Sequence, residues 1–149
     1  PDTKIYVFAR SQKEQVFAAK LGAFWTGDTC DRPPQHLDSI IDTTPAWLPV
    51  LSAMENLAPG GRLVINAIRK EAGDQKLLMQ LDYERHLWLE KSIRTVANVT
   101  RKDVRECLRL AAQIPLQAKV TEYSLDEANA ALIELKQGHI MGAKVLHLV

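Results

Sequence analysis

The sequence predicts an α/β fold in which helices flank a parallel β-sheet. Two observations favour this class. Short apolar segments alternate along the chain with segments whose apolar residues recur at helical spacing. The segment Leu37–Asp42 also has an apolar centre, which is typical of a strand inside a parallel sheet. The chain contains no internal repeat and no low-complexity tract, so the pattern is that of an ordinary globular fold.

The chain opens with a short apolar strand that leads directly into a helix. The strand lies within Lys4–Ala9, and the helix is expected at Ser11–Leu21, where Gly22 ends it. A second short strand is expected at Ala23–Thr26. A polar loop that contains two prolines, Gly27–His36, follows this strand.

The middle of the chain continues the alternation. After the strand Leu37–Asp42, a helix is predicted by apolar residues at positions i, i+3, i+4 and i+7, namely Trp47, Val50, Leu51 and Met54. Pro49 falls in or near the first turn of this helix, where proline is tolerated. The turn residues Ala58–Gly61 end the helix, and Arg62–Ile68 is the next strand.

The second half begins with residues 69–82, which are expected to form a loop with a helical turn. A short helix at Tyr83–Glu90 and a strand at Ser92–Val99 follow. Thr100 is expected to cap the next helix, with Asp103 in its first turn. The apolar face of that helix is predicted to lie in the core, and it comprises Val104, Cys107, Leu108 and Ala111.

The last part of the chain is expected to be extended at Val120–Tyr123 and to continue into a helix that a capping box, Ser124–Glu127, begins. Gly138 ends this helix, and Lys144–Val149 is a final strand. The residues that this helix is expected to bury are Ala128, Ala131, Leu132 and Leu135.

Composition excludes several functions. The 149 residues fit one domain, 46% of them are hydrophobic and 25% charged, and the net charge of +1 includes no basic block, so no nucleic-acid partner is expected. No apolar run reaches the roughly 20 residues that a membrane span needs. The two cysteines, Cys30 and Cys107, lie far apart, which favours the cytoplasm over a disulfide framework. They form no cluster with the four histidines, so no metal site is expected.

The tip of the first strand carries the main functional signal. A strand followed directly by a helix is the second half of a βαβ nucleotide-binding unit, and the strand tip faces the ribose of a bound dinucleotide. An acidic residue at this tip is typical of NAD binding, whereas here Ala9 is followed by Arg10 and Ser11. Because an arginine pairs with a 2′-phosphate, the tip favours NADP over NAD. An ordinary surface arginine is the alternative interpretation.

Part of a complete dinucleotide fold is missing from the sequence. None of the seven glycines forms the G-x-G-x-x-G motif, and none precedes the first strand. The strand at the middle of the sheet is therefore expected to be absent, which would leave two unpaired edges. We interpret the chain as a Rossmann-like sheet that lacks its first strand and glycine motif, and as a piece of a longer protein.

Four stretches resemble the zinc-dependent, medium-chain alcohol dehydrogenases, most of all the bacterial branch called propanol-preferring. They are VFARSQKEQVFAAKLGAFWTGD at 7–28, LAPGGRLVINAI at 57–68, EKSIRTVANVTRKD at 90–103 and YSLDEANAALIELKQGHIMGAKVL at 123–146. The resemblance covers the C-terminal, coenzyme-binding half of that family. It implies a partial dinucleotide-binding domain at residues 1–115 and a tail at 116–149 that returns to a catalytic domain absent from this chain.

The resemblance also implies a set of cofactor-binding residues. They are Arg10 and Ser11 at the adenosine ribose or its phosphate, Thr43, Thr44 and Pro45 in the groove, Asn66, Ala67 and Ile68 near the nicotinamide ribose, and Val96, Ala97 and Asn98 beside the nicotinamide. Many relatives hold the pyrophosphate with an arginine in the tail. Ala143 stands at that position here, which departs from the family pattern, so either Lys144 makes the phosphate contact instead or the contact is absent.

The function implied is hydride transfer between NAD(P), with NADP favoured, and a small alcohol or aldehyde. Zinc would assist in the intact protein without binding to this chain, which contributes no catalytic residue and is expected to be inactive alone. The resemblance also implies a homo-oligomer, with Ser92–Val99 as the contact. The alternatives are an S-adenosylmethionine-dependent methyltransferase, which also has a P-G-G turn before a strand, and a free-standing NADP-sensing domain.

Overall fold

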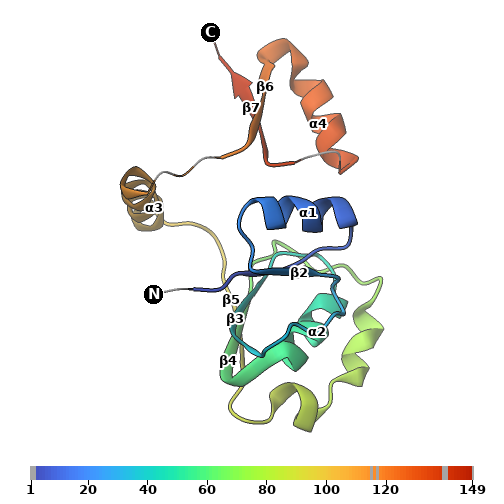
Figure 1. Ribbon diagram of the computed structural model, residues 1–149. Coiled ribbons are helices and arrows are strands. Elements are labelled where there is room, and N and C mark those ends of the chain that lie inside the picture. Colours follow the sequence, from blue (N-terminus) through green and yellow to red (C-terminus); the bar gives the residue numbers. More distant parts are fainter. Residues whose placement is uncertain (1–2, 115, 117, 139–140, 149) are drawn as a thin grey trace. The chain divides into compact units, whose positions relative to one another are not determined.

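A computed structural model describes residues 3–114, 116, 118–138 and 141–148 (Figure 1). The chain divides into two compact units, residues 1–98 and 99–149. Strands within each unit pair in parallel and helices accompany them, so the predicted α/β class is confirmed.

The first unit begins with the predicted strand–helix–strand step. Strand β1 (Tyr6–Phe8) pairs in parallel with β2 (Trp25–Gly27), and helix α1 (Gln12–Lys20) connects them. Ser11, expected as the first residue of the helix, is its N-cap and forms a capping box with Glu14. Gly22 follows the helix with φ +98°, a value that side chains rarely adopt, and it allows the chain to turn back toward β2.

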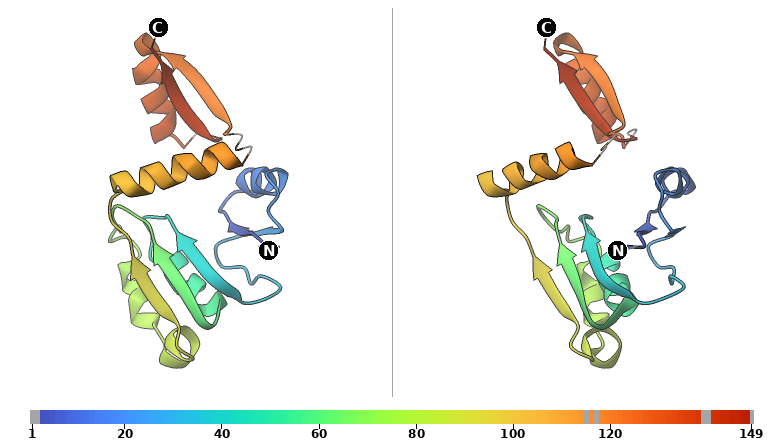
Figure 2. Two further views of the ribbon diagram at one scale, coloured as in Figure 1. Left: turned by 90° about the vertical axis from the view of Figure 1, so that its left-hand side faces the viewer. Right: turned by 60° about the vertical axis from the view of Figure 1, so that its left-hand side comes forward.

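A three-stranded parallel sheet forms the larger part of this unit. Its order is β3 (Leu37–Asp42), β4 (Leu57–Ile65), β5 (Ser92–Thr95), and helix α2 (Leu48–Asn56) joins the first two strands. Figure 2 shows the three arrows side by side and pointing the same way. The predicted start of β4 at Arg62 was wrong, because Leu57 already pairs with Leu37 before the register shifts.

Packing of α2 on the sheet makes the core. Met54 and Leu63 are fully buried, and Leu57 is 1% exposed. The predicted apolar face of α2 is confirmed, since Val50, Leu51 and Met54 are buried and Trp47 packs against the cluster. Pro49 lies in the first turn, as predicted. The buried face of α2 can therefore be predicted from helical spacing alone.

The connection from β4 to β5 contains two short helices, a 3-10 helix and a π-helix. They are η1 (Gln75–Gln80) and η2 (Tyr83–Leu87). The helix predicted at Tyr83–Glu90 is thus shorter than expected. Leu89 and Glu90 have φ values of 65° and 62°, which are incompatible with its continuation. The strand predicted at Ser92–Val99 likewise ends at Thr95.

The sheet of the first unit is interrupted between β1 and β3. Within the described residues, β1 pairs only with β2, and β3 pairs only with β4. Each of the two strands therefore has one edge without a strand partner. This break falls where the sequence predicts that a central strand is absent.

The second unit contains α3 (Arg101–Gln113), β6 (Val120–Ser124), η3 (Leu125–Glu127), α4 (Ala128–Lys136) and β7 (Ala143–His147). Strands β6 and β7 pair in parallel. The cap predicted at Thr100 and the capping box predicted at Ser124–Glu127 are both present, and Thr100 also forms a capping box with Asp103. The final strand begins one residue before Lys144, and its predicted last residue, Val149, lies outside the described residues.

Burial in the second unit differs from the prediction. Val104, Cys107 and Leu108 on α3 are exposed, and so are Leu132 and Leu135 on α4. Of the expected core positions, Ala131 is buried, whereas Ala111 and Ala128 are half-buried. Helical spacing identifies which face of a helix is apolar, but it does not supply an element to cover that face.

Candidate functional site

The predicted site residues all follow the C-terminal ends of parallel strands. Residues 43–45, 66–68 and 96–98 come directly after β3, β4 and β5. Because these strands are parallel neighbours, the structure brings the three segments to one edge of the sheet. Arg10 and Ser11 follow β1, which belongs to the separate two-stranded sheet. Ligands of open α/β sheets bind outside the carboxyl ends of the strands, so this edge is the candidate site.

Backbone hydrogen bonds join the three tips of the larger sheet. The N–H of Asn66 donates to the carbonyl oxygen of Asp42 at 2.8 Å, and the N–H of Val96 donates to that of Ile65 at 3.2 Å. The ladder thus continues one residue beyond β4 and β5. It fixes the starting point of each tip segment relative to its neighbour.

Most of the predicted residues at this edge are accessible. Thr44 and Ala67 are half-buried, and the others of the three segments are exposed. Ile68 and Val96 are apolar side chains among them, and Ile68 is exposed in full. An apolar surface at a strand edge is suited to contact a ligand or another protein segment.

Arg10 and Ser11 differ in what their side chains do. Arg10 is exposed, and within the described residues it has no ion-pair partner, so its guanidinium is available to an anion. The hydroxyl of Ser11 is already engaged: it accepts the N–H of Glu14 at 3.2 Å and donates to the Glu14 carboxylate at 2.8 Å. Ser11 therefore serves α1 as a cap whatever else it contacts.

Lys70 is a residue of this edge that the sequence analysis missed. Its ammonium group donates to the carboxylate of Asp42 and to the carbonyl oxygens of Thr44 and Ala46, the last two at 2.9 and 2.8 Å. The side chains of Lys70 and Asp42 are 11% and 3% exposed. The available signal was Asp42 itself, because a carboxylate at the end of a strand that is predicted to lie inside a sheet needs a partner.

Asp74 is a second missed residue. Its carboxylate accepts the N–H groups of Trp47 and Leu48, both at 2.8 Å, at the start of α2. The hydrogen bond from Leu48, followed by that from Trp47, stabilises the ionised form and holds the pKa of Asp74 below its ordinary value. A carboxylate 26 residues away in sequence thus caps a helix that has no side-chain cap of its own.

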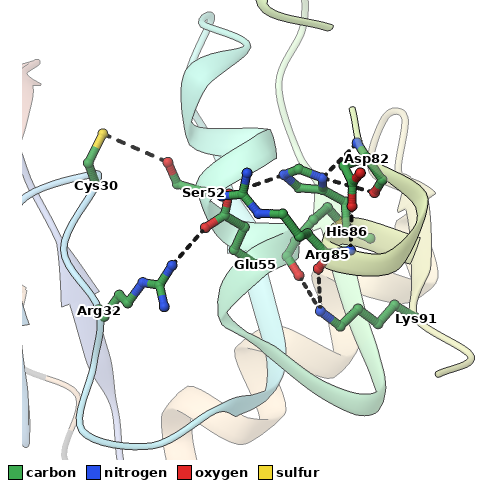
Figure 3. A network of polar contacts seen from close by, with 9 residues as sticks. Cys30, Arg32, Ser52, Glu55, Asp82, Arg85, His86 and Lys91 are labelled. Carbon is green, nitrogen blue, oxygen red and sulfur yellow. Dashed lines mark hydrogen bonds and ion pairs between the residues drawn. The ribbon is translucent and has the colours of Figure 1, made fainter. Parts of the chain in front are cut away.

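A second polar cluster lies at the other end of α2, around Glu55 (Figure 3). Its carboxylate meets Arg32 at 3.4 Å, Arg85 at 2.5 Å and Nε2 of His86 at 3.2 Å. The ring of His86 is buried, and its Nδ1 lies 2.9 Å from the N–H of Asp82. A pocket beside Glu55 is lined by Arg32, Arg85 and His86 among others, and by none of the predicted site residues.

Three further observations bear on function. Within residues 3–114, 116, 118–138 and 141–148, no three or more histidine, cysteine, aspartate or glutamate side chains are placed to hold a metal ion. Cys30 and Cys107 are exposed free thiols. None of the described helices is both long enough and apolar enough to cross a membrane.

Comparisons with known proteins give a relative in sequence and solved structures with the same fold. No protein-family profile matches the chain. Over 143 residues the chain is 38% identical to "Probable alcohol dehydrogenase AdhA" of Mycobacterium tuberculosis (strain CDC 1551 / Oshkosh), covering 96% of this chain and 40% of that protein.

Solved structures share the fold at low sequence identity. A Clostridium scindens protein named as a "putative zinc-binding dehydrogenase" matches with a TM-score of 0.78 and 15% identity, over 98% of this chain and 43% of its own. The YhdH protein of Escherichia coli K-12, solved with bound NADPH, matches with a TM-score of 0.71 and 14% identity, over 96% and 46%. The chain thus spans about two fifths of the length of the relatives that it matches.

Proposed function

On the premise that the chain is a portion of a medium-chain alcohol dehydrogenase, which its sequence relative and its fold support, we propose that it supplies the coenzyme-binding part of an oxidoreductase. The whole protein would transfer a hydride between NAD(P) and a small alcohol or aldehyde. NADP is favoured over NAD because Arg10, rather than a carboxylate, follows β1.

The observation that carries this proposal is the common edge at the tips of β3, β4 and β5. Three short segments meet there, they are largely exposed, and backbone hydrogen bonds fix their starting points. Such an edge is where parallel α/β sheets bind nucleotides. The residues that we propose to contact the coenzyme are Arg10, Ser11, Thr43, Thr44, Pro45, Asn66, Ala67, Ile68, Val96, Ala97 and Asn98.

This chain's own residues would bind and orient the coenzyme. A bound nicotinamide coenzyme supplies the hydride acceptor, and the protein supplies its position. Arg10 would pair with a phosphate on the adenosine ribose, and the tips of β4 and β5 would flank the nicotinamide end. Within the described residues Arg10 has no ion-pair partner, so it can bind this phosphate without losing an existing contact.

Zinc does not fit the described part of the chain, since no three suitable ligands lie together there. We therefore propose that any zinc dependence of the whole protein resides outside this chain and that the chain alone is inactive. We further propose that residues 1–115 form the partial dinucleotide-binding domain, that 116–149 return to a catalytic domain, and that the protein is a cytoplasmic homo-oligomer.

The methyltransferase alternative is not favoured, because the sequence relative is an alcohol dehydrogenase. Ligand-dependent stabilisation distinguishes the two functions, since a ligand raises the unfolding temperature when it binds the folded state. The purified chain is heated with NADPH, NADH or S-adenosylmethionine. We expect NADPH to raise the midpoint most, and stabilisation by S-adenosylmethionine alone would support the alternative.

The Arg10→Ala variant tests the coenzyme preference. Without the guanidinium, the advantage of NADPH over NADH should fall by about tenfold in dissociation constant, which corresponds to one charge-assisted hydrogen-bonding group. Lys20→Ala, which removes a charge from the other end of α1, should leave the preference unchanged. An Arg10→Ala variant that still prefers NADPH would contradict the assignment.

A further inference from the structure

We infer that Lys70 is a positioning residue of the proposed coenzyme site, and that it acts by holding the segment from Thr43 to Trp47 in one shape. The inference rests on the proposed function. It adds a residue that does not itself belong to any of the strand-tip segments. The geometry of its ammonium group is the main support.

The ammonium of Lys70 has its full complement of partners inside this segment and the residue before it. An ammonium carries three hydrogens, and here the acceptors are the Asp42 carboxylate and the carbonyl oxygens of Thr44 and Ala46. Two carbonyls that are two residues apart are thus directed at one nitrogen. The ammonium therefore binds the segment at two points of its backbone and restricts the direction of both carbonyl groups.

Asp42 completes the arrangement from the other side. One carboxylate oxygen meets Lys70, and the other, Oδ1, accepts the N–H of Thr44 at 3.0 Å and its hydroxyl at 2.8 Å. Both carboxylate oxygens are therefore occupied, and Thr44 is held through its N–H, its hydroxyl and its carbonyl. Thr44 is the half-buried centre of the first proposed contact segment.

The same region of chain also ties the β3 tip to the β4 tip. Lys70 stands two residues after Ile68, the last proposed contact of the β4 tip. The next residue, Glu71, donates its N–H to the carbonyl oxygen of Pro45 at 2.7 Å. Since the N–H of Asn66 also binds the carbonyl of Asp42, the two tips are connected at both ends. A shift of one tip would break contacts with the other.

The burial of the ion pair favours a role in positioning. Both side chains are almost removed from solvent, and a buried pair contributes little net stability relative to apolar residues of the same size. The pair instead fixes the orientation of the backbone around it, because each hydrogen bond holds its acceptor at a defined angle. Lys91, by contrast, donates to the carbonyls of Met54 and Arg85 near the other end of α2, away from the tips.

The test compares four variants of the 149-residue chain with the wild type. Lys70→Met removes the ammonium, and Lys70→Arg keeps the charge without the compact three-donor group. Asp42→Asn combined with Lys70→Met removes both charges, so that no unpaired buried charge remains if Lys70→Met alone fails to fold. Lys91→Met is the control, since it removes a lysine that also holds two carbonyls.

Two measurements are made on each folded variant. The first is the dissociation constant of NADPH. The second is hydrogen exchange of the Thr44 amide without ligand. We expect Lys70→Met, or the double variant, to weaken NADPH binding at least about tenfold and to speed exchange at Thr44. Lys70→Arg should restore part of the NADPH affinity and part of the protection of the Thr44 amide. Lys91→Met should change neither the NADPH affinity nor the exchange at Thr44.

Binding that stays within twofold of the wild type in Lys70→Met and in the double variant would overturn the inference. An equal loss in Lys91→Met would also overturn it, because the effect would then follow from stability alone. If the wild type binds no nucleotide, the proposed function fails separately. The exchange at Thr44 then decides whether Lys70 holds the segment: unchanged exchange contradicts it.

Discussion

Met54 shows how much one side chain contributes to the first unit. It is fully buried between α2 and the sheet, in contact with the cluster that includes Leu57 and Leu63. Met54→Ala removes buried methylene groups and leaves a cavity, so the free energy of unfolding should fall by about 2–5 kcal/mol. Urea denaturation measures this. Met79→Ala is the matched control, because Met79 is 89% exposed and its truncation should change little.

Gly142 matters at the residue scale for a different reason. Its φ of +96° strains any side chain, and an added Cβ would collide with the backbone carbonyl of Lys119, which accepts the N–H of Ala143 at 2.9 Å. Gly142→Ala should therefore destabilise the β6–β7 pair by about 1–3 kcal/mol. Thermal unfolding followed by circular dichroism tests this. Gly73→Ala, where nothing lies within 4 Å of the new Cβ, should unfold like the wild type.

The start of α2 makes the free energy of unfolding depend on pH. The pKa of Asp74 is held below its ordinary value of 3.8, first by the N–H of Leu48 and then by that of Trp47. A carboxyl whose folded pKa is depressed stabilises the fold above the unfolded pKa. This contribution is lost as the pH falls through the lower, folded pKa. Asp74→Asn should thus be less stable than the wild type at neutral pH, and the gap should close below pH 3.8.

The matched control for this pH profile is Asp38→Asn. Asp38 is an exposed carboxylate on β3 for which the described structure records no hydrogen bond. Its stability curve should run parallel to that of the wild type. A gap between wild type and Asp74→Asn that persists unchanged into acid would contradict the capping role, because a protonated carboxyl no longer holds the two N–H groups as a charge.

Elements defined by local pattern could be predicted, and those that depend on distant partners could not. The predicted cap at Thr100 and the predicted capping box at Ser124 each depend on four residues of sequence, and both are present. The capping box at Ser11 is equally local, but it was not predicted. The early start of β4 depends on the pairing of Leu57 with Leu37, which no local sequence pattern predicts. The exposed faces of α3 and α4 show the same limit, because helical spacing identifies an apolar face but not the element that would pack against it.

At the scale of the whole molecule, topology explains why the candidate edge was predictable. Once strands are parallel, their tips share an edge, so the segments at 43–45, 66–68 and 96–98 come together without any knowledge of side-chain contacts. Lys70 and Asp74 were missed because they lie in a loop without periodicity, and their partners on β3 and at the start of α2 are more than 20 residues away in sequence. That the predicted residues bind the coenzyme stays a prediction.

The outer strand β5 leads to the prediction about assembly. It pairs only with β4 among the described strands, so its other edge is open. Because the N–H of Val96 points to Ile65 and directions alternate along a strand, the N–H of Thr95 points away from β4. We expect the chain to dimerise through this edge. Thr95→Pro removes the outward N–H while sparing the internal ladder, and should give monomers in sedimentation velocity.

Two controls separate lost pairing from lost folding. Thr95→Ala keeps the N–H and should remain dimeric, whereas Arg94→Pro removes an N–H that points toward β4 and should disturb the sheet itself. Circular dichroism distinguishes that damage from simple dissociation. A wild-type chain that sediments as a monomer at every concentration would contradict the dimer. So would a Thr95→Pro variant that sediments like Thr95→Ala, because backbone pairing along β5 requires the group that proline lacks.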